Sequence, residues 1–260
     1  MAEDHQRIIA HLRQTRKYRD LCDETLLRIA SWASARHPSI KEATKAAKRK
    51  LHQVYGAYAG QVDVDQIEAL LASLDPSDPR PVCEQILRTH VSTSERVADL
   101  AEIYPAIWAE TGLPGRVMDL ACGLNPFTVP WMGPIGEYTA CDIDIRLAGC
   151  THHFLEMMPV KGRSTCNDLL VTVPICQADV VLMFKVLPCL EQQEKGAARA
   201  VLGQLTAPHV VVSFPARSLG GHERGMEVHY EGFLTDLIRG LRRVLRRLPF
   251  ERETYYVLSH

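Results

Sequence analysis

The stretch from Val117 to Pro126, with the sequence VMDLACGLNP, constrains the fold most strongly. A short apolar run, 116–120, ends in the small residues Ala121, Cys122 and Gly123, which predicts a buried parallel strand that leads into a tight turn. Asn125 and Pro126 follow, a pair typical of a helix start. Strand, small-residue turn and helix start together form a cradle whose backbone N–H groups can point at a ligand.

An acidic residue, Asp142, ends the next apolar-rich run, about 20 residues after the turn. At the tip of a second strand its carboxylate could accept hydrogen bonds from both hydroxyls of a ribose. The turn itself contains one glycine, Gly123, where a dinucleotide-binding loop has three. A ligand without a pyrophosphate, such as S-adenosylmethionine (SAM), therefore fits better, although an ordinary strand–loop–helix unit would carry the same pattern.

Composition excludes several classes of protein. The chain has 260 residues with 46% hydrophobic and 23% charged residues, an ordinary globular balance. No apolar run is long enough to cross a membrane, and the N-terminus lacks the order of a signal peptide. The eight cysteines show no C-x-x-C spacing, so we expect neither a zinc ribbon nor a redox pair, no metal site, and a cytoplasmic location.

The charge is unevenly distributed. The whole chain has a net charge of −1, but residues 1–60 contain twelve Lys/Arg and six Asp/Glu. Helical patterns cover 5–21, 24–35, a segment after the capping box Ser39–Glu42, and about 64–74. Lys41, Lys45 and Lys48 share one helix face, which could track phosphates or could simply be solvated. The proline-rich segment 75–81 predicts a linker, so we expect a small helical domain at 1–80.

The remainder, 81–260, alternates between strand and helix patterns. A short helix is expected at 82–89, and a capping box at Ser92 and Glu95 predicts a helix that runs to Thr111. Strands are expected at 116–120, 137–142, 164–167, 178–185, 209–214 and as a pair near 249–258, with helices near 126–132, 144–157, 190–205 and 227–247. This alternation predicts an α/β domain with a mostly parallel sheet covered on both faces.

Ligands of such sheets bind at the carboxyl ends of the strands. The expected strand ends bring together a set of candidate residues: Asp119, Ala121, Gly123, Asp142, Asn167, Asp168, Phe184 and Lys185. An acid at each of three successive positions is the layout of a class I SAM-dependent methyltransferase, with Asp142 at the ribose and Asp168 at the adenine amino group.

Motifs along nearly the whole chain resemble one family of enzymes. They are Lys17-Tyr-Arg19, Leu51-His52, His90-x-Ser-Thr-x-Glu-Arg96, Asp119-x-Ala-Cys-Gly-Leu-Asn-Pro126, Phe184-Lys-x-Leu-Pro188, Ser213-Phe-Pro-x-Arg-Ser-Leu-Gly-Gly221 and Gly225-Met-Glu227. The chain resembles the aminoglycoside-resistance 16S rRNA (guanine(1405)-N(7))-methyltransferases. The resemblance implies a Rossmann-like, seven-stranded SAM domain at 81–260, preceded by a helical domain that docks on the assembled 30S subunit near helix 44. It also implies resistance to 4,6-disubstituted deoxystreptamines such as gentamicin and kanamycin. We expect the enzyme to be a monomer.

The same resemblance implies residue roles. His90 and Arg116 would hold the methionine end of SAM. Apart from the resemblance, we take Lys185 and Arg217 as candidates for the reaction centre. Arg217 could also hold a phosphate or the guanine edge of the substrate. The candidates for rRNA contact are Lys17, Arg19, Lys48 and Lys50. Arginines at 239, 242, 243, 246 and 247 match no family motif; they fit either an amphipathic covering helix or an extra RNA contact.

The chemistry of methyl transfer narrows the choice of the RNA atom that is methylated. Guanine N7 carries an exposed lone pair and no proton, so it needs no general base; catalysis then rests on alignment and on exclusion of water. The alternatives are another position of the rRNA, either a decoding-site adenine N1 or a cytosine C5 attacked through Cys189. A non-enzymatic rRNA-binding protein on the same scaffold is a further alternative.

Overall fold

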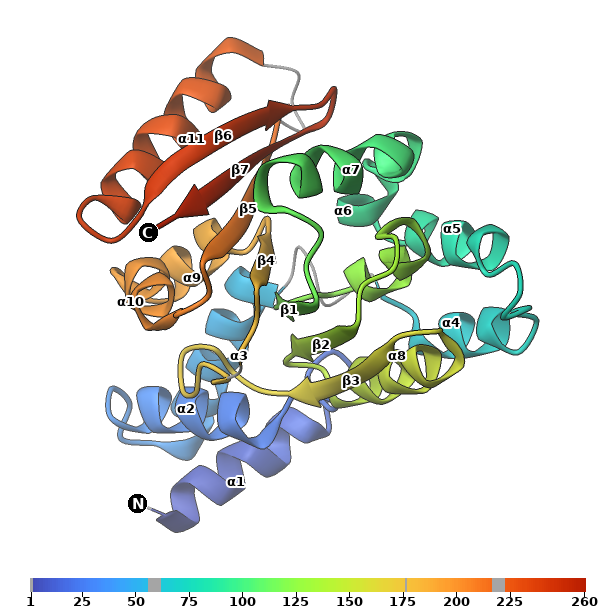
Figure 1. Cartoon of the computed structure of the whole chain (residues 1–260). Coiled ribbons are helices and arrows are strands. Elements are labelled where there is room, and N and C mark those ends of the chain that lie inside the picture. The colour runs from blue at the N-terminus through green and yellow to red at the C-terminus, as the bar shows by residue number, and fades with distance from the viewer. Residues whose placement is uncertain (1, 56–61, 176, 217–222) are drawn as a thin grey trace.

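The computed structural model describes residues 2–55, 62–175, 177–216 and 223–260. Within these residues, seven strands form one sheet in the order β3-β2-β1-β4-β5-β7-β6 (Figure 1). The strands are β1 Arg116–Leu120, β2 Glu137–Asp142, β3 Lys161–Cys166, β4 Val180–Phe184, β5 His209–Pro215, β6 Arg243–Pro249 and β7 Glu253–Ser259. Strands β1 to β5 are mutually parallel, and the β6–β7 hairpin pairs antiparallel with β5. The expected mostly parallel, Rossmann-like sheet is confirmed.

Both faces of the sheet are covered, because successive residues of the central strands enter different cores. In β4, Val180 and Leu182 join one core, whereas Val181 and Met183 join the other. The first core lies under α4 Val64–Leu71, α5 Arg80–Arg88, α7 Leu100–Thr111, the 3-10 helix η2 Asn125–Trp131 and α8 Ile145–Met157. The second lies under α9 Leu187–Gln193, α10 Ala197–Gln204 and α11 Glu223–Ile238. Such two-sided burial explains why the strands read as continuous apolar runs.

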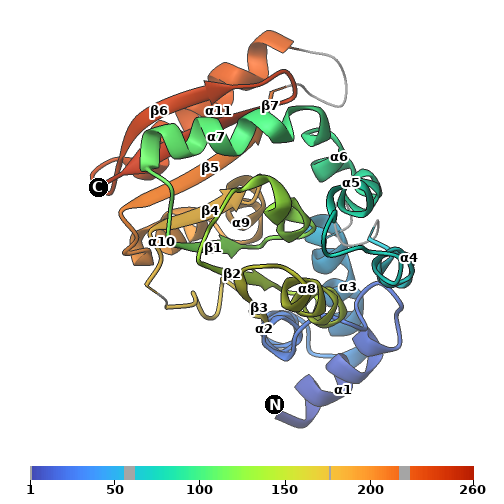
Figure 2. The same cartoon turned by 45° about the vertical axis from the view of Figure 1, so that its right-hand side comes forward.

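Three N-terminal helices have a core of their own. These are α1 Ala2–Arg13, α2 Asp23–Ser34 and α3 Ile40–Tyr55, and their apolar faces meet around Ile8, Ile29 and Leu51. At the start of α3, Glu42 N donates to Ser39 Oγ at 3.2 Å, which is one of the two hydrogen bonds of the predicted capping box. By contrast, α4 packs against α8 as part of the main core. In both views α2 lies beside the β3 edge of the sheet (Figures 1 and 2).

One predicted helix is partly wrong. The pattern at 227–247 predicted a helix, but α11 ends at Ile238, Gly240 adopts a left-handed φ of 73°, and Arg243–Pro249 forms the edge strand β6. The arginines of this region therefore do not share a helix face. Arg242 is buried and donates to the carbonyls of Leu205 and Ala207, and Arg246 pairs with Glu110 at 3.3 Å. Arg239 and Arg247 pair with Asp236 and Glu231.

Other helices also differ from the expectation. The pattern at 5–21 gives α1, which ends at Arg13 and is followed by turns, and the segment near 126–132 is the 3-10 helix η2. The helix near 190–205 is two helices, α9 and α10, because Gly196 between them has a φ of 86°. Ser92 does not cap a long helix. Instead, His90 caps the four-residue helix α6 Val91–Ser94, the 3-10 turn η1 Val97–Asp99 follows, and α7 begins at Leu100. In the part of the chain that the structure describes, no helix has the length and apolar character needed to cross a membrane.

Candidate active site

A pocket opens where the strand order reverses, between the carboxyl ends of β1 and β4. Strands β2 and β4 lie on opposite sides of β1. The loops that follow these strands therefore diverge and leave a crevice, as expected for this sheet type. The pocket is lined by residues from all these loops and from the N-terminal region: Leu21, Val62, His90, Ser92, Thr93, Arg96, Ala121, Cys122, Gly123, Leu124, Asp142, Ile143, Asp144, Leu147, Asn167, Asp168, Leu169, Phe184, Lys185, Val186, Cys189, Leu190 and Gln193.

The turn after β1 forms the floor of this pocket. Ala121 and Gly123 both have left-handed φ angles, 52° and 50°. Such a conformation is costly for alanine and free for glycine, and it bends the chain sharply at the end of the strand. A Cβ built on Gly123 would meet no atom within 4 Å, so its face toward the pocket is open. The predicted strand and tight turn are therefore present, but the helix that follows is the 3-10 helix η2, and its N-cap is Leu124, not the expected Asn125.

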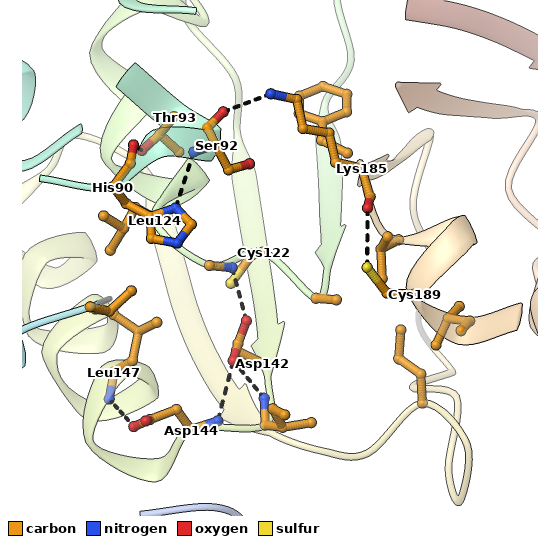
Figure 3. Close-up of a pocket in the computed structure, with 18 of the residues that line it drawn as sticks. His90, Ser92, Thr93, Cys122, Leu124, Asp142, Asp144, Leu147, Lys185 and Cys189 are labelled. Carbon is orange, nitrogen blue, oxygen red and sulfur yellow. Dashed lines mark hydrogen bonds between the residues drawn. The ribbon is translucent and has the colours of Figure 1, made fainter. Parts of the chain in front are cut away.

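Asp142 is the central acid of the pocket (Figure 3). Its Oδ2 accepts from Gly123 N at 2.9 Å, and its Oδ1 accepts from Ile143 N at 2.7 Å and from Asp144 N at 3.2 Å. Burial raises the pKa of Asp142, and these three N–H groups oppose the rise. Since a carboxylate has roughly four acceptor positions, the amides leave about one for a ligand.

Asp119 lies on β1, behind the turn, and is 1% exposed. Its Oδ2 accepts from Asn125 Nδ2 at 2.8 Å and from the Tyr138 hydroxyl. Among the described residues Oδ1 has no hydrogen-bond partner. Burial raises the pKa of Asp119 to about 6, so holding this carboxylate charged at neutral pH costs free energy.

A buried ion-pair network forms the opposite wall. Arg96, 2% exposed, donates from Nη2 to Glu253 Oε1 at 2.9 Å and from Nη1 to Asn125 Oδ1 at 2.6 Å. Lys185 Nζ lies 3.2 Å from Glu253 Oε2, pairs with Glu95 and donates to the Ser92 carbonyl at 3.0 Å. Figure 3 shows this amine turned toward Ser92, away from Asp142. The methylene chain of Lys185 thus lines the pocket, while its ammonium is ion-paired with two glutamates.

The acid predicted at the third strand end, Asp168, is 3% exposed and also has partners. Its Oδ2 accepts from Arg28 Nε and from Thr25 Oγ1, both at 2.9 Å, and its Oδ1 accepts from Leu170 N at 2.9 Å. Asn167 precedes it in the pocket lining. On the other side, Phe184 packs under the Arg96 guanidinium, 5.0 Å from ring centroid to Cζ.

Of the expected cofactor residues, Arg116 does not reach the pocket. It stands at the amino end of β1, five residues before the Ala121 turn, which is about 16 Å along an extended strand. There its Nη2 pairs with Asp179 Oδ1 at 3.2 Å. The expectation of a SAM contact for Arg116 is corrected by this placement. His90, in contrast, lines the pocket as expected, and its Nδ1 accepts from Ser92 N at 3.3 Å.

Arg96, which lines the pocket, and Glu253, which pairs with it, are residues to which the sequence analysis assigned no role. Arg96 could have been found, because it closes the same motif that contains His90. Glu253 offered no signal, since it reaches Arg96 across 157 residues of chain.

The candidate rRNA residues lie in different environments. Lys17 and Arg19 are exposed in the turns after α1, and Lys48 is partly exposed on α3. Lys50 donates to the Gln193 carbonyl at 3.0 Å and lies 4.8 Å from the Trp32 ring centroid, so its ammonium is held beside the pocket. Burial lowers the pKa of Lys50. Arg217 falls outside the described residues.

Comparisons with known proteins agree with the site. The family model for ribosomal RNA methyltransferases (FmrO) matches residues 14–240. The chain is 34% identical over 255 residues to the 16S rRNA (guanine(1405)-N(7))-methyltransferase of Micromonospora echinospora, covering 95% of this chain and 93% of that protein. It is 39% identical over 217 residues to the enzyme of the same name from Serratia marcescens, covering 83% and 82%.

A solved structure resembles the chain over its whole length. The crystal structure of 16S rRNA methyltransferase RmtF in complex with S-adenosyl-L-homocysteine superposes with a TM-score of 0.88 at 33% identity and covers 100% of this chain and 99% of that one. The rRNA methylase from Escherichia coli superposes with a TM-score of 0.80 at 30% identity and covers 98% and 99%. With its methyltransferase sheet, its pocket at the ends of β1, β2 and β4, and this similarity along the full chain, the protein belongs to the FmrO family of SAM-dependent ribosomal RNA methyltransferases.

Proposed function

We propose that this protein transfers the methyl group of SAM to N7 of guanine 1405 in the 16S rRNA of the assembled 30S subunit. The observation that carries the proposal is the full-length similarity to enzymes of that name, in both sequence and fold. Because aminoglycosides such as gentamicin and kanamycin bind at the decoding region, in helix 44, the product would confer resistance to them. We also propose that it acts as a monomer in the cytoplasm, where its ribosomal substrate would be.

The pocket residues fit the cofactor. SAM supplies an activated methyl group on a sulfonium. We assign the remaining acceptor position of Asp142 to the ribose, and the Asn167–Asp168 segment to the adenine. His90 and Arg96 line the part of the pocket assigned to the methionine end. Asp119, an expected cofactor residue, is not among the lining residues and supports the turn from behind through Asn125. The open face of Gly123 leaves room for the ligand against the backbone.

The protein's contribution to the chemistry is positioning. Guanine N7 attacks with its own lone pair, so no residue has to remove a proton. Lys185 is unsuited to act as a base, because its ammonium is paired with Glu95 and Glu253. We propose instead that Lys185 holds the left-handed turn after β4, where its φ is 57°, and thereby shapes the wall next to the methyl group. Arg217 remains our candidate for a phosphate or guanine contact.

The hydrogen bond that the structure describes at Cys189 favours N7 chemistry over cytosine C5 chemistry. That reaction needs a cysteine thiolate as nucleophile. Cys189 Sγ is a thiol donor to the Lys185 carbonyl at 3.6 Å, and a backbone carbonyl cannot take up its proton.

The test is to incubate the protein with 30S subunits and SAM that carries a labelled methyl group, and then to map the modified nucleotide. We expect one label, on N7 of guanine 1405, with no label on 50S subunits. An Arg116→Ala variant is the matched control, since Arg116 lies outside the pocket, and it should label the same nucleotide. Label on an adenine or a cytosine, or retained binding to 30S subunits without any methyl transfer, would refute the proposal.

A further inference from the structure

The N-terminal region contributes to the lining of the pocket and contacts the residues around it, although it lies far from them in sequence. Leu21, just before α2, lines the pocket and forms an isolated antiparallel bridge with Asp144. Two backbone hydrogen bonds accompany this bridge: Cys22 N to Ile143 O at 2.8 Å and Ile145 N to Asp20 O at 2.7 Å. The loop that contains Asp142 is thus joined directly to the start of α2.

A second connection is made by a single side chain. Arg28, on α2, donates from Nε to Asp168 Oδ2 at 2.9 Å and from Nη2 to Gln193 Oε1 at 2.9 Å. Asp168 follows β3, and Gln193 ends α9, which follows β4. These two segments line the same pocket, so the guanidinium spans both of them.

The neighbouring contacts hold this arrangement in one geometry. Thr25, one turn before Arg28, donates to the same oxygen of Asp168 at 2.9 Å, and Asp168 N donates to Glu24 Oε2 at 3.1 Å. From α3, Lys50 Nζ donates to the Gln193 carbonyl at 3.0 Å. The Arg28 side chain is 17% exposed and that of Asp168 is 4% exposed, so water competes little for their charged hydrogen bonds.

We propose that Arg28 is a positioning residue for the cofactor: by holding Asp168 and Gln193 from the N-terminal helices, it sets the width and the acceptor geometry of the adenine half of the pocket. With Oδ2 occupied by Arg28 and Thr25, and Oδ1 by one N–H group, the free acceptor position of Asp168 is on Oδ1. Arg28 thereby selects which oxygen faces the adenine amino group. The inference rests on SAM as the cofactor and not on which nucleotide is methylated.

The test measures the affinity of the apo protein for S-adenosyl-L-homocysteine and for adenosine by calorimetry. Arg28→Ala should weaken both about tenfold, because adenosine contains the half of the ligand that Arg28 positions. Arg28→Lys keeps a charge that can reach Asp168 but not both partners, and should restore part of the loss. Arg36→Ala is the matched control: it lies in the turn just after the end of α2 and its Nη1 donates to the Trp32 carbonyl, so it should leave both affinities unchanged.

Steady-state kinetics separate positioning from general loosening of the fold. We expect Arg28→Ala to raise KM for SAM while kcat at saturating SAM and KM for 30S subunits change less than twofold. Should this variant fail to fold, Thr25→Val replaces it: the isosteric change removes one donor to Asp168, and adenosine should bind two- to fivefold more weakly. Unchanged adenosine affinity in a folded Arg28→Ala or Thr25→Val protein would overturn the proposal, as would equal losses in SAM and 30S parameters.

Discussion

The buried carboxylate of Asp119 should make the stability of the apo protein depend on pH in a predictable way. Burial raises its pKa from 3.8 to about 6 in the folded protein. Over the interval between these values the folded state holds the proton more tightly than the unfolded state does. The free energy of unfolding of the wild type therefore falls, through this residue, as the pH rises from about 4 to about 6.

Replacement by asparagine removes this titration. A shift of about two pKa units lowers the free energy of unfolding of the wild type by at most about 3 kcal/mol. About 2 kcal/mol of this loss falls between pH 4 and pH 7, and the asparagine variant does not have it. The asparagine Oδ1 can still accept from Tyr138 and Asn125, but its Nδ2 then occupies the position where Asp119 Oδ1 has no partner in the described structure. An unpaired buried amide costs about 1–3 kcal/mol at every pH.

The effect of the lost titration depends on pH and the cost of the unpaired amide does not, so the two can be measured separately. At pH 7 they largely cancel, so we expect Asp119→Asn to have a stability close to that of the wild type. At pH 4 the variant should be less stable than the wild type by about 1–3 kcal/mol, since only the cost of the amide remains. Urea unfolding of both apo proteins at half-unit steps from pH 4 to pH 7 gives the difference directly. Parallel curves would refute the reasoning, because they would mean that Asp119 is not a titrating buried charge.

Three further predictions concern function. Asp142→Asn should weaken SAM binding at least tenfold, since a charged acceptor of this kind contributes about 1.5–3 kcal/mol; calorimetry against Arg116→Ala, which should bind normally, checks it. Cys189→Ser should keep most of the methyl transfer to 30S subunits because N7 attack needs no protein nucleophile, and a folded variant without turnover would contradict this. Charge reversal at Lys17 and Lys48 should weaken 30S binding and flatten its dependence on salt by about two units of slope, with SAM affinity intact; identical affinities and slopes at several salt concentrations would show that these lysines do not contact rRNA.

The expectations that depended on local pattern agree with the structure. The strands at β1, β2, β4 and β5 were predicted within a few residues, because strands buried on both faces are continuous apolar runs between turn residues. The turn at Ala121–Gly123 and the acid at Asp142 meet as predicted, since parallel strands bring their carboxyl ends to one edge.

In the region after Ile238, the local sequence pattern fits both a helix and a strand. Leu237, Leu241 and Val244 fall at helical spacing, and arginine is a good helix former, so the sequence favoured a longer helix. The structure instead pairs 243–249 with β7, which completes the antiparallel edge of the sheet. An edge strand gains its stability from its partner, and that partner is not part of the local pattern.

What the sequence by itself determined was the class of fold, the cofactor cradle and the family, because these depend on runs and spacings within short segments. Tertiary structure alone decided what each charged side chain does. Lys185 is an ion-pair partner because Glu95 and Glu253 arrive beside it from 90 and 68 residues away. Arg28 reaches the pocket because α2 packs against the loop after β3. A charge in a protein takes its role from its neighbours at about 3 Å, and for these residues the chain folds back over long distances to supply them.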